Sequence, residues 1–238
     1  MRRLSLVVAL LFTLAPLSTA ALAQAPKAKA KKRPPNPAYA AVVDDPRLPR
    51  VLLLGDSISI GYTVPVRELL AGKANVHRPA DNCGPTSRGV ESIERWLGDG
   101  KWDLIHFNFG LHDIAHLDEK GGRVDPPAGQ HQVLIAQYEK NLRQLVARLK
   151  KTGAKLIWCS TTPVPEGSAY RVKGDEIPFN EVAAKIMREE GIEIDDLYAY
   201  ALPRLAEIQL PANVHYTPEG SKVLAQQVAS SIEHGLKK

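Results

Sequence analysis

The sequence lacks several features that would indicate a metal-dependent or multidomain protein. It contains only two cysteines among 238 residues, and no spacing of cysteine and histidine resembles a zinc site. We therefore expect neither a metal nor an organic cofactor. After residue 50 the chain has no second linker and no internal repeat. The length that remains is enough for one domain with a sizeable core.

An excess of charge of one sign is also missing from most of the chain. The net charge of the whole sequence is +5, but residues 1–50 alone hold nine Lys and Arg against two Asp. The rest of the chain carries 22 basic and 24 acidic residues, so it is close to neutral. Basic clusters such as residues 27–33 occur in segments that bind nucleic acid or anionic surfaces. We interpret this one as a solubilising tether with a cell-envelope association, and we expect no nucleic-acid partner.

A long apolar run is present only at the N-terminus. Residues 1–23 contain two arginines, then an apolar stretch, then Ala-Leu-Ala as a small-residue cleavage site. This layout is typical of a secretory signal peptide. The run is short for a membrane span, which needs about 20 apolar residues, although an uncleaved anchor is the alternative. The protein is thus expected to be periplasmic or secreted.

The remaining chain divides into a linker and a domain. Residues 24–49 are rich in Ala, Lys and Pro, a composition that predicts a disordered or extended linker. The domain extends over residues 50–238. In an oxidising compartment a disulfide between Cys83 and Cys159 is an open alternative, because both lie near the carboxyl ends of expected strands.

Apolar runs alternate with helical patterns through the domain. Short aliphatic-rich runs predict five strands, at residues 50–54, 74–77, 102–109, 155–160 and 192–195. Apolar residues at helical spacing predict helices at about residues 64–71, 90–97, 133–149, 179–188 and 217–233. This alternation implies a parallel sheet covered on both faces. The expected fold class is α/β, a three-layer α/β/α sandwich with a five-stranded parallel sheet.

Polar segments follow the first three strands and precede the last helix. They are GDSIS (55–59), DNCGPTS (81–87), GLHD (110–113) and NVHYT (213–217). Ligands of open α/β sheets bind at the carboxyl ends of the strands, so these segments are expected to converge. Together they offer a hydroxyl, an imidazole and backbone N–H groups in glycine-containing turns, which are the parts of a serine hydrolase. By itself, Ser57 could equally be a helix N-cap.

In combination the segments resemble the sequence blocks of the SGNH (GDSL-type) hydrolase family. GDS resembles the first block, NCGPTS the glycine block, GLHD the third block, and VHYTPEG (214–220) the histidine block. The resemblance covers about residues 50–236 and implies the flavodoxin-like fold of that family. It also implies that Ser57 is the nucleophile and His215 the general base. The N–H groups of Ser57 and Gly84, or of Gly89 in another register, would face the oxyanion.

The chain departs from the family pattern at two positions. The third block usually supplies an Asn that donates to the oxyanion, and here His112 stands in its place. An imidazole N–H can also donate a hydrogen bond. The family usually has an Asp three residues before the histidine, whereas this chain has Ala212 there and Asn213 one residue later. Asn213, a backbone carbonyl, or a carboxylate such as Asp195 or Asp196 could orient His215.

The remaining polar residues favour a structural interpretation. Asp56 and Asp113 are expected to brace their turns, His106 to lie in the core and His234 to be solvated.

The segments 115–132 and 163–178 are long connections, which are often lids or binding loops, and neither has an apolar run suited to a long acyl chain. The expected function is an exported serine esterase that removes acetyl or another small acyl group from a carbohydrate through an acyl-enzyme, and the expected partner is a small-molecule or polysaccharide ester substrate. The alternatives are a lysophospholipase or thioesterase, and a catalytically impaired glycan-binding protein.

Overall fold

The structure is a computed structural model that describes residues 35–237. The expected signal peptide, residues 1–23, and the linker residues 24–34 lie outside the described part of the chain. Two residues of the segment 35–49, the rest of the expected linker, contact the domain or are buried: Ala38 is 1% exposed, and the Asp45 N–H donates to Asn75 Oδ1 at 2.9 Å. Within the described residues, no helix is both long and apolar enough to span a membrane.

A five-stranded parallel sheet forms the centre of the domain. The strand order is β2-β1-β3-β6-β7, and every neighbouring pair is parallel. The strands are β1 (Arg50–Leu54), β2 (Asn75–His77), β3 (Leu104–Phe107), β6 (Lys155–Cys159) and β7 (Glu193–Asp195). Four of the five residues of β1 and all four of β3 are buried, as expected for strands covered on both faces. The structure confirms the predicted fold class.

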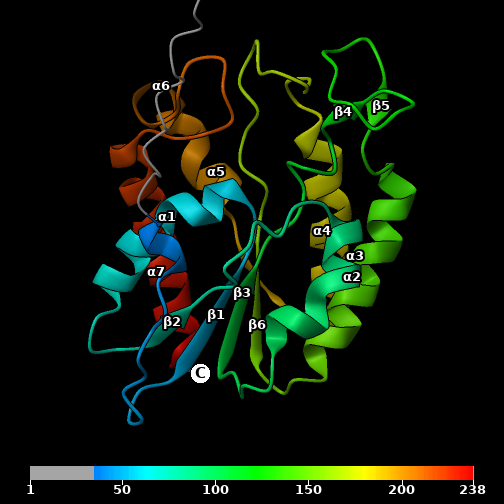
Figure 1. Cartoon of the computed structure of the whole chain (residues 1–238). Coiled ribbons are helices and arrows are strands. Elements are labelled where there is room, and N and C mark those ends of the chain that lie inside the picture. The colour runs from blue at the N-terminus through cyan, green and yellow to red at the C-terminus, as the bar shows by residue number, and fades with distance from the viewer. Residues whose placement is uncertain (1–34, 238) are drawn as a thin grey trace, which may run out of the picture. The chain divides into compact units, whose positions relative to one another are not determined.

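Helices cover both faces of this sheet (Figure 1). One layer contains α1 and α7, which pack on each other, and the other contains α2, α3 and α4. The long helices are α1 (Ser57–Leu69), α2 (Thr86–Leu97), α3 (Ile135–Lys150), α4 (Glu176–Glu190) and α7 (Pro218–Leu236). Short elements precede β1 or lie before α7: η1 (Pro37–Tyr39), α5 (Leu197–Ala201), η2 (Leu202–Arg204) and α6 (Leu205–Ile208). The loops that follow β1, β3 and β6 therefore meet at one edge of the sheet.

Two features of the fold differ from the sequence expectation. Helix α1 begins at Ser57 rather than near residue 64, because Gly61 and Pro65, both poor residues for a helix interior, obscure the pattern. The long connection after β3 contains a small antiparallel hairpin, β4 (His116–Leu117) and β5 (Gln130–His131). Two-residue strands are too short to leave an alternating pattern in a sequence.

The two cysteines are buried and are not joined in a disulfide. Burial raises the pKa of Cys83 to about 12 and the pKa of Cys159 well above its ordinary value. Both side chains therefore act as small apolar groups of the core, and the thiolate, the reactive form, is disfavoured.

Candidate active site

Ser57 lies at the carboxyl end of β1 and is the first residue of α1. The N-cap of this helix is Asp56, whose Oδ1 accepts a hydrogen bond from the Ile58 N–H at 2.9 Å, as the sequence analysis expected of a bracing residue. Capping by Asp56 leaves the Ser57 hydroxyl free for other partners. It also places Ser57 in the first helical turn, where backbone N–H groups have no acceptor within the helix.

His215 lies in the loop between α6 and α7, and backbone and side-chain contacts hold that loop in place. A β-bridge pairs Gln209 with Tyr216, and the Gln209 side chain donates to the Pro163 carbonyl at 2.9 Å. Thr217, which follows Tyr216, caps α7: its hydroxyl oxygen accepts a hydrogen bond from the Gly220 N–H. His215 is thus an exposed side chain on a fixed backbone.

The structure brings Ser57, His215 and Asn213 into one hydrogen-bonded chain. His215 Nε2 lies 2.9 Å from Ser57 Oγ, and His215 Nδ1 lies 2.7 Å from Asn213 Oδ1. The backbone N–H of His215 also donates to Asn213 Oδ1, at 3.0 Å. Because a backbone N–H can only donate, it holds the amide oxygen, and not the amide nitrogen, toward the histidine. Nδ1 then carries the proton, and the lone pair of Nε2 faces the serine hydroxyl.

The two carboxylates considered for orienting His215 are engaged elsewhere. Asp195 Oδ2 lies 2.9 Å from Nε2 of the buried His106, and Asp196 accepts from the Ser160 hydroxyl and caps α5. Ala212, at the position of the family's acid, has a left-handed backbone with φ of 49°. His106 is 0% exposed, which confirms its expected position in the core.

The glycine expected to face the oxyanion lies in a tight turn before α2. Gly84 has φ of 63°, a conformation that favours glycine, and its N–H donates to Asn82 Oδ1 at 3.0 Å. Asn82 would have to release this N–H before Gly84 could donate to an oxyanion. Gly89 lies within α2, where an added Cβ would contact Leu145 and Phe109 at 3.0 Å. Gly89 therefore has a packing role, and its N–H donates to the Pro85 carbonyl at 3.1 Å.

His112 is half-buried beside the same edge, and its surroundings favour the neutral imidazole. Burial is the main cause that lowers its pKa; the Asp56 carboxylate opposes the effect, whereas Arg171, Arg123 and His215 add to it. A neutral imidazole retains one N–H donor. Arg171 also donates through Nε to the Leu111 carbonyl at 2.6 Å, which fixes the turn that carries His112.

Asp113 connects this turn to the start of α2. Its Oδ1 accepts from the Thr86 N–H at 2.9 Å and from the Thr86 hydroxyl at 2.5 Å. Burial raises the pKa of Asp113 to about 7, partly offset by these hydrogen bonds. Asp113 is therefore a structural acceptor, as the sequence analysis expected.

Sequence reasoning missed Arg78, a buried residue beneath the Ser57 loop. Its guanidinium donates to the hydroxyls of Ser59 and Thr63 at 3.1 and 2.9 Å, and to the carbonyls of Gly55 and Asp81 at 3.3 and 3.1 Å. It thus connects the turn after β1 to the turn after β2. A single arginine after a three-residue strand leaves no recognisable sequence signal.

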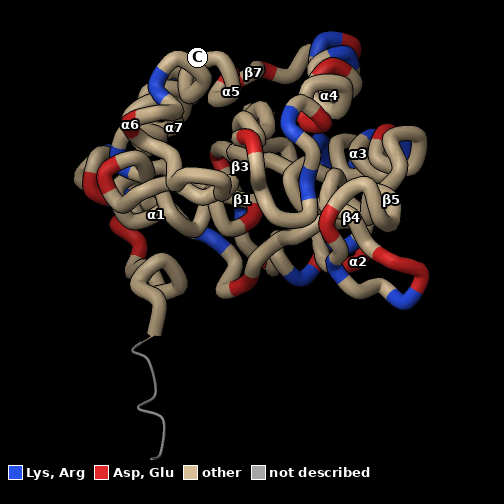
Figure 2. The backbone as a smooth tube through the Cα atoms, turned by 90° about the horizontal axis from the view of Figure 1, so that it is seen from above, with Lys and Arg blue, Asp and Glu red and all other residues tan. Residues whose placement is uncertain are grey.

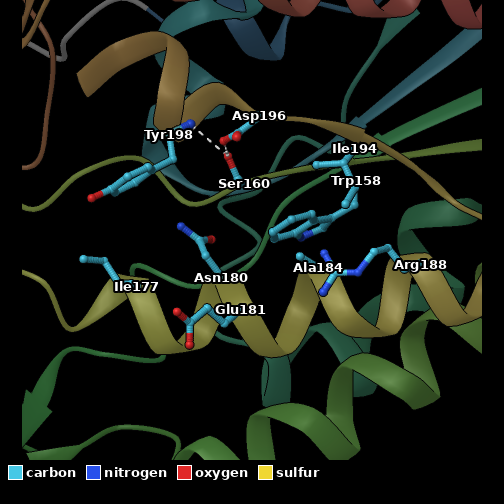
Figure 3. Close-up of a pocket in the computed structure, with 10 residues that line it drawn as sticks. All are labelled: Trp158, Ser160, Ile177, Asn180, Glu181, Ala184, Arg188, Ile194, Asp196 and Tyr198. Atoms are coloured by element: carbon cyan, nitrogen blue, oxygen red, sulfur yellow. Dashed lines mark hydrogen bonds between the residues drawn. The ribbon is translucent and has the colours of Figure 1, made fainter. Parts of the chain in front are cut away.

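A cavity of about 380 Å³ borders Gly84 and His112. Its lining is mostly polar: Asn82, Gly84, Pro85, Arg88, His112, Leu117, Gly121, Arg123 and Gln132. Figure 2 looks onto this edge of the sheet and shows acidic and basic residues spread around it. A second cavity lies between α4 and the β6–β7 side of the sheet (Figure 3). It shares no lining residue with the first.

Comparisons with known proteins agree with this fold and these motifs. The sequence model of the GDSL-like Lipase/Acylhydrolase family matches residues 53–223, whereas a search of curated protein sequences gives no significant match. The acetylxylan esterase Axe2 from Geobacillus stearothermophilus superposes with a TM-score of 0.64 at 19% identity, covering 77% of this chain and 94% of Axe2.

Two further solved structures are similar. The acetyl xylan esterase AlAXEase has a TM-score of 0.62 at 17% identity, covering 77% of this chain and 99% of that protein. A lipase/acylhydrolase from Enterococcus faecalis has a TM-score of 0.63 at 18% identity, covering 78% and 96% of the two chains. At these identities the structures establish the shared fold, and the family match covers most of the sequence. The chain belongs to the GDSL-like lipase/acylhydrolase family, that is, the SGNH hydrolases, and is a carboxylic ester hydrolase.

Proposed function

We propose that the protein is an exported serine esterase that removes acetyl or another small acyl group from a carbohydrate. The observation that carries the proposal is the hydrogen-bonded chain from Ser57 through His215 to Asn213. A serine hydroxyl 2.9 Å from a histidine nitrogen has the geometry of a nucleophile beside its base.

The chemistry proceeds in two steps. His215 Nε2 takes the hydroxyl proton while Ser57 Oγ bonds to the acyl carbon. The ester C–O bond then breaks, and the leaving alcohol takes the proton from His215. A water molecule activated by His215 next attacks the acyl-enzyme and releases the carboxylic acid and Ser57. The oxyanion of each step is stabilised by the Ser57 N–H, the neutral His112 and, after release from Asn82, the Gly84 N–H.

The surroundings of Ser57 favour a small acyl group and a polar alcohol. The cavity beside His112 has Leu117 as its single aliphatic lining residue. A cavity next to the start of α1, bordered by Ile58 and Leu111, has a volume of about 10 Å³, room for about one water molecule. Neither suits a long acyl chain. The exposed His215 suits a large substrate that approaches from solvent, and two of the structural neighbours bear the name acetyl xylan esterase.

The test is a series of p-nitrophenyl esters together with acetylated xylo-oligosaccharides. We expect hydrolysis of the acetate, a steep decrease from butyrate to octanoate, and release of acetate from the oligosaccharides. Rates that increase with chain length would instead indicate a lysophospholipase or thioesterase. Absence of hydrolysis with every ester would favour the glycan-binding alternative.

Export is the second part of the proposal, and the sequence of residues 1–23 supports it. Two buried, unreactive thiols are compatible with an oxidising compartment. N-terminal sequencing of the protein recovered from a fractionated bacterial host should find Gln24 as the first residue in the periplasm or medium. Intact Met1 in the cytoplasm would contradict export.

A further inference from the structure

Three side chains with metal-ligating atoms converge near the active site but outside the catalytic set. His116 and His131 are paired across the β4–β5 hairpin, and Asp175 immediately precedes α4. His131 Nε2 lies 2.7 Å from Asp175 Oδ2, and His116 Nε2 lies 3.8 Å from the same oxygen. Figure 1 shows the hairpin beyond the carboxyl ends of the strands, on the side of α3 and α4.

The tautomer of His116 leaves a nitrogen lone pair directed at this cluster. His116 Nδ1 lies 3.1 Å from the Ala128 carbonyl, an acceptor, so Nδ1 carries the proton. Nε2 is then an unprotonated acceptor. It is buried and has no hydrogen-bond partner within the described chain. A buried polar atom without a partner costs about 1–3 kcal/mol, so this nitrogen requires an explanation that the His131–Asp175 contact does not supply.

The arrangement around His116 is the one that metal-binding histidines adopt. Such a histidine generally donates its other ring N–H to a carbonyl or carboxylate, which fixes the ring and its tautomer. Ala128 provides that carbonyl. His131 is held in turn by an edge-to-face contact with Phe179, with ring centroids 5.5 Å apart. The side chains of His116, His131 and Asp175 are 12%, 25% and 24% exposed, so an ion can enter from solvent.

The distances between the three atoms suit a tetrahedral ion. Zn²⁺ binds imidazole nitrogen and carboxylate oxygen at about 2.0–2.2 Å, which places neighbouring ligand atoms roughly 3.4 Å apart. Asp175 Oδ2 lies 2.7 Å from His131 Nε2 and 3.8 Å from His116 Nε2, on either side of this value, and all three atoms lie within 4.8 Å of one another. Shifts of several tenths of an ångström would complete the site. The ion would replace the proton now shared between His131 and Asp175.

We propose that His116, His131 and Asp175 bind one Zn²⁺ ion, with water in the fourth position. Two imidazoles and one carboxylate favour Zn²⁺ over Mg²⁺ or Ca²⁺, which prefer all-oxygen sites. A second group, His106, Cys159 and Asp195, is also close enough to bind an ion, but its His106–Asp195 pair is 0% exposed. Metal entry there would require the core to open.

The ion would join the hairpin to the start of α4 and so fix one wall of the cavity beside His112. Two hydrogen bonds already join the hairpin to the loop that precedes α4: the backbone N–H of His116 donates to the Tyr170 carbonyl at 2.8 Å, and the backbone N–H of Tyr170 donates to Asp125 Oδ1 at 2.9 Å. Leu117 of β4 and Arg123 of the connection between β4 and β5 line the cavity beside His112. We therefore assign the ion a structural role. Its binding does not depend on the substrate or on the proposed esterase function.

The test uses the full chain, purified without a histidine tag, stripped with a chelator and titrated with Zn²⁺ by calorimetry and thermal unfolding. We expect one ion per chain and an increase in Tm that follows the Zn²⁺ concentration. His116→Gln should weaken binding by at least about 100-fold, because loss of a second-shell partner alone costs 10- to 100-fold. The metal-free Tm of this variant should stay close to that of the wild type, because His116 Nε2 has no partner to lose and the Gln amide N–H can replace the Nδ1–H donor to the Ala128 carbonyl.

His234→Ala, which removes a histidine from the last turn of α7, is the matched control and should bind Zn²⁺ like the wild type. Co²⁺ in place of Zn²⁺ should give the intense visible absorption of a four-coordinate ion, and Asp175→Asn should abolish it. Absence of Zn²⁺ binding, or binding that His116→Gln leaves unchanged, would overturn the proposal. These readouts do not involve ester hydrolysis, so they remain decisive if the proposed function is wrong.

Discussion

Replacing Asn213 by Asp is expected to make the enzyme faster. Asn213 Oδ1 lies 2.7 Å from His215 Nδ1, so an aspartate of the same shape would place a negative charge beside the imidazole. A hydrogen bond to a charged group contributes about 1.5–3 kcal/mol, against about 0.5–1.5 kcal/mol for a neutral one. Because both side chains are exposed, we use a gain of about 1 kcal/mol in the transition state, which is about fivefold in rate.

The assay is kcat and kcat/KM for p-nitrophenyl acetate as a function of pH. Asn213→Asp should increase kcat about fivefold and move the acidic limb of the kcat/KM profile to higher pH, because an adjacent carboxylate favours the protonated imidazole. Asn213→Ala removes the acceptor and should lower kcat by at least about tenfold. A slower Asp variant, or an Ala variant with wild-type kcat, would refute the argument that Asn213 orients His215.

Three further predictions concern the support of the site. His112→Leu should lower kcat by about 100- to 1000-fold with little change in KM, as for a lost oxyanion donor; His112→Gln should retain more activity, and equal activity of the two would exclude the role. Arg78→Met should destabilise the protein by about 2–3 kcal/mol, because buried carbonyls and hydroxyls lose their donor. An unchanged Tm would contradict this. Because burial raises the pKa of Asp113 to about 7, the folded protein holds its proton more tightly than the unfolded chain. Chemical denaturation should therefore find stability falling as pH rises from about 4 to 7, and Asp113→Asn should remove that decrease.

The sequence was informative where function depends on local patterns. The aliphatic runs of the strands and the alternation with helices led to the correct fold class. The motifs around Ser57 and His215 identified two residues that the structure places 2.9 Å apart. Their catalytic roles, and those of Gly84, His112 and Asn213, remain predictions until activity is measured.

Features that depend on distant parts of the chain could not be predicted. Asp113 meets Thr86 at the start of α2 across 27 positions, and Asp175 meets His131 across 44. No local spacing records such contacts, so the sequence gave no indication of the proposed Zn²⁺ site. The burial of Ala38 is a similar case, because the Ala- and Pro-rich composition around it gives no indication of that packing.

The most direct test of the central claim is covalent labelling by a fluorophosphonate, followed by intact mass spectrometry and peptide mapping. The account predicts one adduct per chain, located on Ser57 and absent from Ser57→Ala. Labelling of His215→Ala should be much slower, because the hydroxyl has lost its base. A wild-type protein that forms no adduct, or an adduct that persists in Ser57→Ala, would contradict the assignment of Ser57 as the nucleophile.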